Sequence, residues 1–548
     1  MYLTSDPLHA NCVPLAEHLR VLSDFKTILE GSDAKSDHII TLQKTVIEYS
    51  KLIIELGEQV KLLQQMHFGK QTEIGEKIID TTNKGCVVDH DGNDCGEELI
   101  DVASYKRIKN KKNKGRLVDM SSLPRYTIFH DLPPECQNCA NCGNTLEKFS
   151  EKSEQLETIP KLVYCVEHIR YKYNCKSCEQ IIMAPKEFSP IPKSLAGASL
   201  IAEVTMNKVA YHMPCYRQSK ILANAGIDIS DNTIGKWIMD AGNALWPLAE
   251  QFWREVAASE YLQVDETPVK ILKPEKKGYI WIYYNPILNF VVYDLALGRS
   301  ADNPEHRLAD FTGKLHTDGY IGYNKLHNNG QGAFNCNTHA RRKFTDVVKI
   351  SNNKTGIAAQ AVLQLQELYA IEDEARNNNL TFDERKKLRQ QKAKPIWEKY
   401  IAWLKEQVSL VPPKSRLGGA IQYTLNRLPK LMAYLEHGEV EIDTNGVENL
   451  VRPVALGRRN WLFMGNVESG QIYMLFNSLI QSCILQKINP HTYIHYILTK
   501  VHALRRGEVS ARELLPHWIN KELLEQFSKE QLELQAHVLN NLVYPTKS

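Results

Sequence analysis

The chain has 548 residues, of which 43% are hydrophobic and 24% charged, and its formal net charge is +3. This length is too great for one hydrophobic core, and the small net charge excludes a protein whose whole surface is polybasic. The sequence has no signal peptide pattern and no uncharged apolar run near 18 residues, so we expect no membrane span. With twelve cysteines and no export signal, it predicts a cytoplasmic protein whose cysteines bind metal.

A heptad repeat predicts a coiled coil over about 39–66, within an N-terminal region of residues 1–70. Its a positions hold β-branched residues and its d positions mostly leucine, which favours a parallel two-stranded coil. These residues are Ile39, Val46, Ile53 and Val60 at a, and Leu42, Tyr49, Leu56 and Leu63 at d. The alternative is an amphipathic helix that packs on its own domain.

Residues 71–125 have the composition of a linker, acidic at first and then basic. The acidic part, 71–104, is polar and without periodicity. The basic run "YKRIKNKKNKGR" begins at Tyr105 and contains seven basic side chains and no acid. Such a run is either a solvated tether or a segment that follows a phosphate backbone without reading sequence.

Five cysteines cluster in two short motifs and predict a zinc-binding ribbon over residues 126–190. "CQNCANCGN" contains Cys136, Cys139 and Cys142, and "YNCKSCEQ" contains Cys175 and Cys178. Two Cys-x-x-Cys knuckles complete a tetrahedral Zn²⁺ site, which is structural because four thiolates leave no open position. Gly143 suits a knuckle turn, so we choose Cys139, Cys142, Cys175 and Cys178 over Cys136. The segment "KLVYCVEHIRYKYN" alternates like ribbon strands; the alternative is reduced free thiols.

Residues 191–250 have the order of a helix-turn-helix module. Helical apolar spacing runs from Ser199 to Tyr211, and Pro214 suits the first turn of a second helix that ends near Ala225. After a turn at Gly226, Ser230 caps a third helix that is expected to end at Trp237. Three helices in this order either read DNA or simply pack together.

The stretch "YLQVDETPVKIL", from Tyr261, predicts a strand that ends at Asp265, although Asp and Pro are also common turn residues. Two apolar runs joined by Asn285 and Pro286 follow, then a short helix and a fourth strand that ends on Asp318. "GAFNCNTHARRKF" predicts a fifth strand that turns into a basic helix. This order is that of a ribonuclease H-like domain, in which strands one and four are neighbours. Asp265 and Asp318 are therefore expected to meet.

Glu448, on a predicted helix start in "IDTNGVENLVRPVALGRRNWLFMG", is the candidate third acid, with Arg452 one turn later. Phosphodiester chemistry uses two hard divalent ions held by carboxylates. Arg458, Arg459 and Trp461 form a basic and aromatic patch that suits DNA; the alternative is a surface turn with a core Trp. Residues 346–435 have helical spacing and predict an insertion, which positions DNA or serves as a scaffold.

Four motifs, "VDETPVK", "HTDGYIGYN", "CNTHARRKF" and "VENLVRPVALGRRNWLF", together resemble the transposases of the insertion sequence 66 family, bacterial members of the DDE superfamily. "HFGKQTE", "LPRYTIFHDLP", "MPCYRQSKILANAGIDISDNTIGKWI" and "ARELLPHWI" extend the resemblance over nearly the full length. The family usually has Asn-Asn after the position of Asp443 and Arg after the Glu, whereas this chain has Thr444 and Asn449.

The resemblance implies that Asp265, Asp318 and Glu448 are the catalytic metal ligands. Asp265 would bind both of two Mg²⁺ (or Mn²⁺) ions, and the other two acids one ion each. Cys336 and His339 match a Cys-x-x-His pattern of related transposases, whose role is open between metal binding and core packing.

We therefore expect a DNA transposase that cleaves element ends and transfers the 3′-hydroxyl to target DNA. Its expected partners are double-stranded DNA (terminal inverted repeats and target), a second copy through the coiled coil, and small accessory proteins of the same element. In a bacterial cytoplasm it would join the nucleoid when bound to DNA. The alternatives are an inactive repressor, a coiled-coil and zinc scaffold, and a stand-alone metal nuclease. The expected DNA contacts are Arg217, Lys236, Arg341, Arg342, Arg452, Arg458, Arg459 and Trp461.

The predicted fold is multidomain α/β: a ribonuclease H-like mixed sheet with a helical insertion, preceded by the coiled coil, the zinc ribbon and the helix-turn-helix. The ribonuclease H-like part is expected over 255–345 and 436–480, the insertion over 346–435, and a C-terminal helical region over 481–548.

Overall fold

The computed structural model describes residues 189–542, except for 324–325, 327–331, 352 and 354, and five short stretches before them: 99–102, 105–108, 162–169, 171–174 and 181–183. The chain divides into two compact units, residues 77–171 and the remainder. The predicted coiled coil and the five clustered cysteines lie outside the described residues. They stay predictions.

The predicted linker contains a two-stranded hairpin. Strand β1 (Leu99–Val102) pairs antiparallel with β2 (Tyr105–Ile108), so that Leu99 faces Ile108 and Val102 faces Tyr105. The start of the basic run is thus a strand, which its polar composition did not predict.

The predicted ribbon strands are shorter than the alternation suggested. Residues 162–169 form no regular element, and their apolar side chains Leu162, Val166 and Ile169 are exposed. A strand needs a ladder partner as well as alternation. In the other unit, β3 (Lys172–Asn174) pairs antiparallel with β4 (Ile181–Met183), and the segment that joins them contains Cys175 and Cys178.

Three helices follow, as the capping and turn residues predicted: α3 (Ala198–Val209), α4 (Cys215–Asn224) and α5 (Asp231–Ala244). Pro214 is the N-cap of α4, and the Ser230 side chain caps α5 by accepting a hydrogen bond from the Thr233 amide. The buried Gln218 side chain donates to the Val204 carbonyl and so ties α4 to α3. Helix α5 continues seven residues beyond Trp237, the end that we expected.

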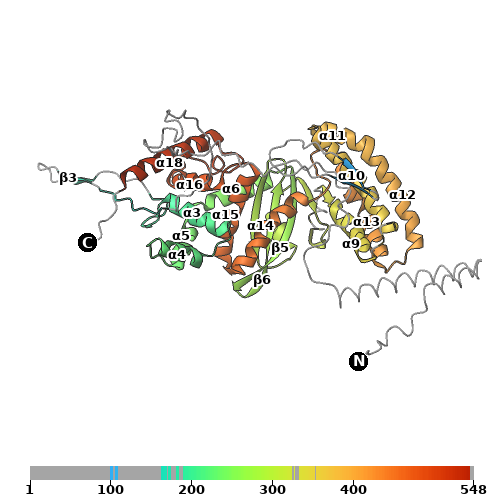
Figure 1. Ribbon diagram of the computed structural model, residues 1–548, viewed down its shortest axis with the longest axis horizontal. Helices are drawn as coiled ribbons and strands as arrows, with labels where there is room; N and C mark the ends of the chain where they lie inside the picture. The colour runs from blue at the N-terminus through green and yellow to red at the C-terminus, as the bar shows by residue number, and fades with distance from the viewer. Residues whose placement is uncertain are drawn as a thin grey trace, which may run out of the picture. The chain divides into compact units, whose positions relative to one another are not determined.

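The central sheet is mixed, with strand order β7-β6-β5-β8-β9, and it is drawn in green in Figure 1. Strands β5, β6 and β7 are antiparallel neighbours, whereas β5, β8 and β9 run parallel. The short β10 also pairs with β5. The bounds are β5 Tyr261–Lys273, β6 Lys276–Asn285, β7 Phe290–Ala296, β8 Lys314–Thr317, β9 Ala333–Asn335 and β10 Met464–Asn466.

Strand β5 does not end at Asp265, contrary to our prediction. Asp265 pairs with Ile282 of β6, and the strand continues through Pro268 to Lys273. The reason lies on the other side of β5, which pairs with β8 only up to Gln263 and with β10 only from Ile271. Between these points the strand is locally an edge, where a proline without an N–H group is tolerated.

The outer edge of β7 is covered by α15 (Val467–Leu485). Hydroxyl oxygens of Ser478 and Ser482 accept hydrogen bonds from the amides of Tyr293 and Val291, at 2.9 and 3.0 Å. These two serines satisfy donors that an exposed edge would offer to another chain. Helix α15 also packs against α3 and α5, so the three-helix module lies on this side of the sheet (Figure 1).

Residues 337–436 are mostly helical and lie beside the β9 edge of the sheet (Figure 1). This observation agrees with the predicted helical insertion, although its boundaries stay predictions. Its elements are α9 Asn337–Ser351, α10 Ile357–Asn377, α11 Phe382–Leu388, the π-helical turn η4 Arg389–Ala393, α12 Lys394–Leu410, α13 Arg416–Met432 and the 3₁₀ turn η5 Ala433–Glu436.

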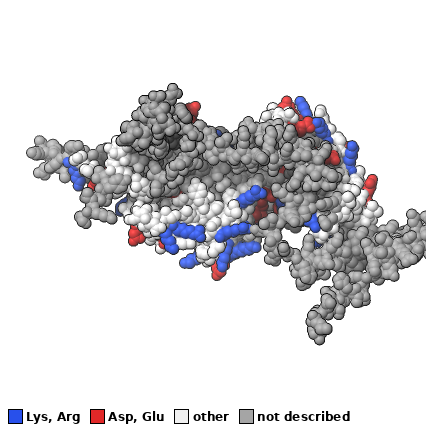
Figure 2. Space-filling model, viewed as in Figure 1, with Lys and Arg blue, Asp and Glu red and all other residues white. Residues whose placement is uncertain are grey.

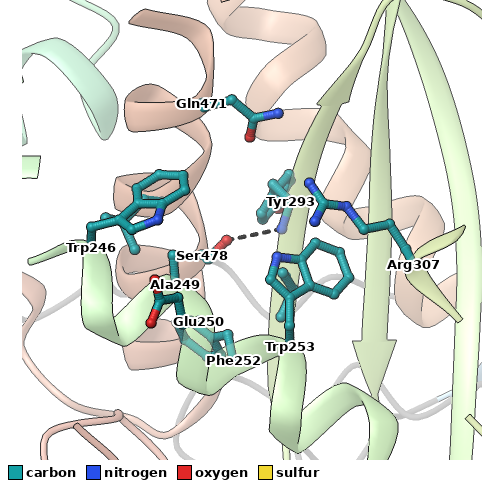
Figure 3. A pocket seen from close by; sticks show the side chains of 11 residues that line it. Trp246, Ala249, Glu250, Phe252, Trp253, Tyr293, Arg307, Gln471 and Ser478 are labelled. Carbon is teal, nitrogen blue, oxygen red and sulfur yellow. Dashed lines mark hydrogen bonds between the residues drawn. The ribbon is translucent and has the colours of Figure 1, made fainter. Parts of the chain in front are cut away.

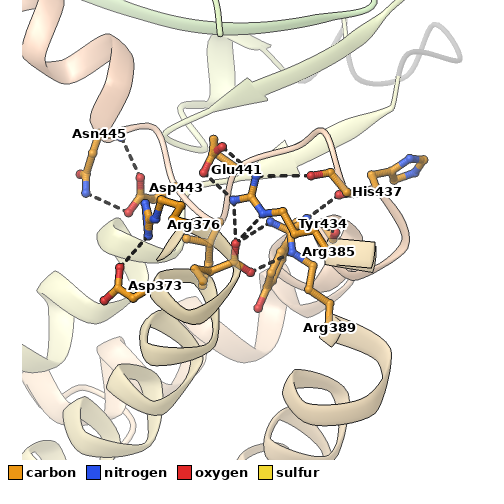
Figure 4. Close-up of polar contacts among 12 residues, drawn as sticks. Asp373, Arg376, Arg385, Arg389, Tyr434, His437, Glu441, Asp443 and Asn445 are labelled. Carbon is orange, nitrogen blue, oxygen red and sulfur yellow. Dashed lines mark hydrogen bonds and ion pairs between the residues drawn. The ribbon is translucent and has the colours of Figure 1, made fainter. Parts of the chain in front are cut away.

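A buried ion-pair network joins this helical region to the segment that returns to the sheet (Figure 4). Glu372 of α10 is fully buried and pairs with both Arg385, at 2.6 Å, and Arg389, at 2.7 Å. Arg385 also pairs with Glu441 at 2.7 Å, and Arg389 donates to the Tyr434 carbonyl. The returning segment is therefore fixed before it enters the next helix.

That helix, α14 (Asn445–Trp461), packs on β5 and β6. The remaining elements are α6 Trp246–Ala257, α7 Asp302–Arg307, η3 Ile321–Tyr323, α16 Pro490–Thr499, α17 Val501–Arg505 and α18 Lys521–Asn541. Helix α16 packs against α3, so the C-terminal helices and the three-helix module share one core. None of the described helices is both long and apolar enough to span a membrane.

We predict that Glu372→Ala destabilises the protein by about 3–5 kcal/mol, because it leaves buried Arg389 without its carboxylate and Arg385 with Glu441 alone. Urea unfolding of the purified protein measures this change. Asp373→Ala is the matched control, since this neighbouring acid is exposed and pairs with the exposed Arg376; its free energy of unfolding should stay within about 0.5 kcal/mol of the wild-type value. Equal unfolding midpoints for the two variants would contradict the role of the network.

Candidate active site

Asp265 and Asp318 meet at the β5–β8 pair. The parallel register joins Tyr261 to Lys314 and Gln263 to His316, and its continuation sets Asp265 opposite Asp318. The β5–β8 ladder itself ends at Gln263 and His316, so the two acids lie just beyond its last pair. The expected meeting of the two carboxylates follows from this register.

The environment of Asp265 disfavours its charged form. Burial is the largest cause and raises its pKa from 3.8 to about 7, and the negative charges of Glu266, Asp318 and Glu448 act in the same direction. Only the Glu266 amide, which donates to Oδ1 at 2.8 Å, opposes this shift. A cluster of acids with so little compensation is typical of a functional site, and a divalent cation is the natural counter-ion.

The adjacent Glu266 is not part of this uncompensated cluster. Its side chain is almost fully buried, pairs with Arg299 at 2.5 Å and accepts a hydrogen bond from the Tyr323 hydroxyl at 2.6 Å. Its charge is therefore satisfied within the protein. Of the two consecutive acids in the motif, Asp265 is the one that is left to bind a ligand.

Glu448 lies in the first turn of α14, as its sequence context predicted. The buried side chain of Gln263 fixes this helix start, because Oε1 accepts from the Val447 amide at 3.2 Å and Nε2 donates to the Asp443 carbonyl at 3.1 Å. The backbone at Gly446 lies so close to the Gln263 side chain that a Cβ atom added there would be 2.9 Å from Oε1. Gln263 precedes Asp265 by two residues, so one short segment of β5 positions both acids.

We did not identify Gln263 from the sequence. The available signal was a polar residue within an otherwise apolar strand, which indicates a buried hydrogen-bonding role.

Residues 336–339 hold the other side of the segment that leads to Glu448. Asn337 donates to the carbonyls of Leu431 and Ile442, both at 3.0 Å. Thr338 donates from its hydroxyl to Asp443 Oδ2 at 2.9 Å. These contacts assign a positioning role to the middle of the Cys-x-x-His motif, which the sequence pattern alone did not reveal.

His339 and Arg342 of α9 face Glu448. Arg342 donates to Oε2 at 3.3 Å, and Nδ1 of His339 lies 3.6 Å from Oε1. Burial lowers the pKa of His339, which favours the neutral ring. Within the described part of the chain, His339 Nδ1 and Glu448 Oε1 are buried without a hydrogen-bond partner. Two facing atoms that each lack a hydrogen-bond partner would suit a shared ligand between α9 and α14, such as a metal ion or its water.

Cys336 is close enough to join such a site but is poorly suited to it. Its Sγ, a His339 nitrogen and a Glu448 oxygen lie within 4.8 Å of one another. However, burial raises the pKa of the Cys336 thiol to about 12, and the sulfur already accepts from the Thr444 amide at 3.3 Å. Through this contact with the Thr444 amide, Cys336 holds the start of α14.

The expected DNA-binding residues differ in how exposed they are and in whether other protein groups already bind them. Arg452 and Arg459 are exposed on α14, whereas Arg458 donates to the Pro268 carbonyl and so satisfies the local edge of β5. Trp461 is 8% exposed and donates to the Tyr473 hydroxyl at 3.2 Å, which favours the core alternative over base stacking. Figure 2 shows basic side chains gathered over the lower part of the sheet and its neighbouring helices on the face in view.

The other expected contacts lie on α9 and on the three-helix module. Arg341 is half-buried over the Tyr369 ring, and Arg342 is exposed but paired with Glu448. Arg217 is exposed and donates to the Tyr216 hydroxyl. Lys236 is exposed and pairs with Asp240. The structure thus brings Asp265, Asp318, Glu448 and Arg342 together and leaves Arg217 and Lys236 on separate helices.

A cavity of about 300 Å³ opens between α6, β7 and α15 (Figure 3). Its walls include Trp246, Trp253 and Arg307, and Arg307 pairs with Asp294 at 2.7 Å. None of the three acids lines this cavity, so it is separate from the candidate active site.

Comparison with known proteins gives two family matches. The model of the IS66 family of transposases matches residues 193–472, just over half of the chain, and the zinc-finger binding domain of IS66 transposases matches residues 137–179. The second range includes Cys139, Cys142, Cys175 and Cys178 and begins after Cys136.

Three curated relatives come from Sinorhizobium fredii. The uncharacterized protein y4jD is 30% identical over 84% of this chain and 93% of its own length. The uncharacterized protein y4hP is 30% identical over 68% of this chain and 71% of its own, and the uncharacterized protein y4qI is 29% identical over 64% and 68%.

We predict that Asp265 contributes stability to the metal-free protein at low pH, and that this contribution is lost as the pH rises from about 4 to about 7. Because folded Asp265 holds its proton more tightly than unfolded Asp265, the contribution is complete below pH 3.8 and is lost through about pH 7. Its upper bound is about 4 kcal/mol. In EDTA at pH 8, Asp265→Asn should therefore raise the melting temperature, whereas Glu275→Gln on the same hairpin should not. Mn²⁺ should stabilise the wild-type protein more than Asp265→Asn; the opposite order would contradict the assignment.

Proposed function

Because this chain belongs to the insertion sequence 66 family of transposases, we propose that it cuts DNA at the ends of a bacterial insertion sequence and joins the exposed 3′-hydroxyl to target DNA. The observation that carries this proposal is the convergence of three acids from separate segments. Asp265 and Asp318 are opposite each other in parallel strands, and Glu448 begins the helix that packs on the same sheet.

We further propose that the sheet is ribonuclease H-like. Its order, with three antiparallel strands followed by two parallel strands next to the first, supports this interpretation. In such a sheet the first and fourth strands carry the first two acids, which matches β5 and β8.

Asp265, Asp318 and Glu448 are the residues that would hold the divalent ions, Mg²⁺ or Mn²⁺. When bound, two such ions activate a water or hydroxyl and stabilise charge on the attacking and leaving oxygens of a phosphodiester. The raised pKa of Asp265 and the partnerless Glu448 Oε1 support a cation at this position. The chain's own part is to hold the carboxylates in place, through Gln263 and through residues 336–339.

The zinc-finger domain and the three-helix module are the proposed DNA-recognition parts. We propose that Cys139, Cys142, Cys175 and Cys178 hold one structural Zn²⁺; the β3–β4 hairpin supports a knuckle at the second pair, because the segment that joins these strands contains both cysteines. Exposed Arg217 and Lys236 are the proposed contacts to terminal repeats. The coiled coil would pair two protomers, and small accessory proteins of the element would assist them.

The decisive test follows strand cleavage and joining on labelled DNA that carries the flanks of this gene's own locus, with a supercoiled target plasmid and the neighbouring genes' products. We expect Mg²⁺-dependent joining that falls at least 1,000-fold in Asp265→Asn, Asp318→Asn or Glu448→Gln, because each removes charge that the ions require. Glu275→Gln, an exposed acid on the same hairpin, should keep full activity. Cleavage retained in Asp265→Asn would refute the acid assignment, and tight binding without chemistry would favour a repressor.

Zinc content gives an independent prediction. The wild-type protein should contain about one Zn²⁺ per chain, and Cys175→Ser or Cys178→Ser should lose most of it, because three thiolates bind zinc less well than four. Elemental analysis of the purified protein measures this content. Cys165→Ser is the matched control, since Cys165 lies between the two pairs and is a free, exposed thiol. Unchanged zinc in Cys175→Ser would contradict the ligand set.

A further inference from the structure

Helix α13 of the helical region contacts the second acid directly. The Tyr423 hydroxyl donates to the main-chain carbonyl of Asp318 at 3.2 Å. The next residue, Gly319, has a positive φ of 85°, and a Cβ there would lie 3.2 Å from Nε of Arg427. Tyr423 and Arg427 are four residues apart, so both lie on the face of α13 that meets the Asp318 turn.

Two cations are stacked on Tyr423. The guanidinium of Arg427 lies 4.0 Å from the ring centroid, and Nζ of Lys343, from α9, lies 5.4 Å from it. The two side chains come from different helices, α13 and α9, and meet at this one ring. Cation–π contact fixes where a charge lies and leaves its hydrogen-bond donors available.

Neither cation is neutralised by a carboxylate within the described part of the chain, unlike their neighbours. Arg342 pairs with Glu448, and Arg299, which stacks on Tyr320 next to Asp318, pairs with Glu266. The described structure therefore holds two positive charges with unused donors next to Asp318. An anion is the ligand that this arrangement fits.

We propose that Arg427 and Lys343 bind the phosphodiester backbone of DNA next to the acid cluster, and so position the strand that is cut. This inference rests on the proposed function, since the acids act on the same backbone. The Tyr423 ring is covered by the two cations, so it orients them and does not stack on a base. Arg427 and Lys343 are thus positioning residues that contact phosphate, one from α13 and one from α9.

The first measurement is the salt dependence of binding to the terminal-repeat DNA. Each phosphate contact contributes about 0.9 to the slope of log K against log salt. Arg427→Ala should lower this slope by about 1, and Arg427→Ala with Lys343→Ala by about 2. Arg427→Lys, which retains the charge, should keep most of the slope. Lys405→Ala removes an exposed charge from α12 and should leave the slope unchanged.

The second measurement identifies the phosphate. Duplexes that carry one neutral methylphosphonate at successive positions around the cleavage site should bind wild-type protein about tenfold more weakly at one or two positions. At one of these positions the methylphosphonate should not weaken DNA binding by Arg427→Ala any further, because this variant already lacks the arginine–phosphate contact. A merely structural role for Arg427 would weaken binding equally at all positions.

This inference would be overturned if Arg427→Ala and Lys343→Ala both kept the wild-type salt slope and the wild-type methylphosphonate profile. If metal-dependent cleavage remained in these variants, the proposed function would still stand. Absence of any DNA binding by the wild-type protein would overturn both.

Discussion

Three carboxylates held close together repel one another, and much of the surrounding structure resists that repulsion. Asp265 comes from a strand, Asp318 from the end of its parallel neighbour and Glu448 from a helix start more than a hundred residues later. Without fixed backbones these acids would separate, since unpaired like charges in a half-buried site cost free energy. The Gln263 contacts to the start of α14 and the hydrogen bonds of residues 336–339 prevent that separation.

The acids differ in how far neighbouring groups compensate their negative charge. Glu266 pairs with Arg299 and accepts a hydrogen bond from Tyr323, and Glu448 pairs with Arg342, whereas Asp265 has no cation partner in the described structure. The site therefore keeps its net negative charge at the position where a divalent ion would bind. The stacked cations on Tyr423 lie beside this negative centre, where an incoming phosphate would need compensation.

Much of this arrangement could be predicted from the sequence because it depends on local patterns. Alternation and turn residues indicated the five strands, Ser230 marked a helix start, and the spacing of Asp265 and Asp318 followed from two strands expected as neighbours. The continuation of β5 past Pro268 could not be predicted, since it depends on where β8 ends and β10 begins. Gln263, Thr338 and Tyr423 act through contacts with distant segments, and a single sequence gives no direct sign of such contacts. Trp461 shows the converse: an aromatic residue beside two arginines suggested a DNA contact, but its indole lies in the core.

Asn337 has a consequence for how this architecture can change. One side-chain amide binds the carbonyls of Leu431 and Ile442, so the two points where the chain leaves and re-enters the catalytic sheet are fastened to the same residue. The helices between these points form a loop whose two ends are held together by Asn337, so the position of the ends does not depend on the length or sequence of the loop. Such a module can be lengthened, shortened or exchanged in evolution while the spacing of the acids is kept, because loop length itself adds only a slowly growing entropic cost. The acid cluster and the helical region can therefore diverge at different rates.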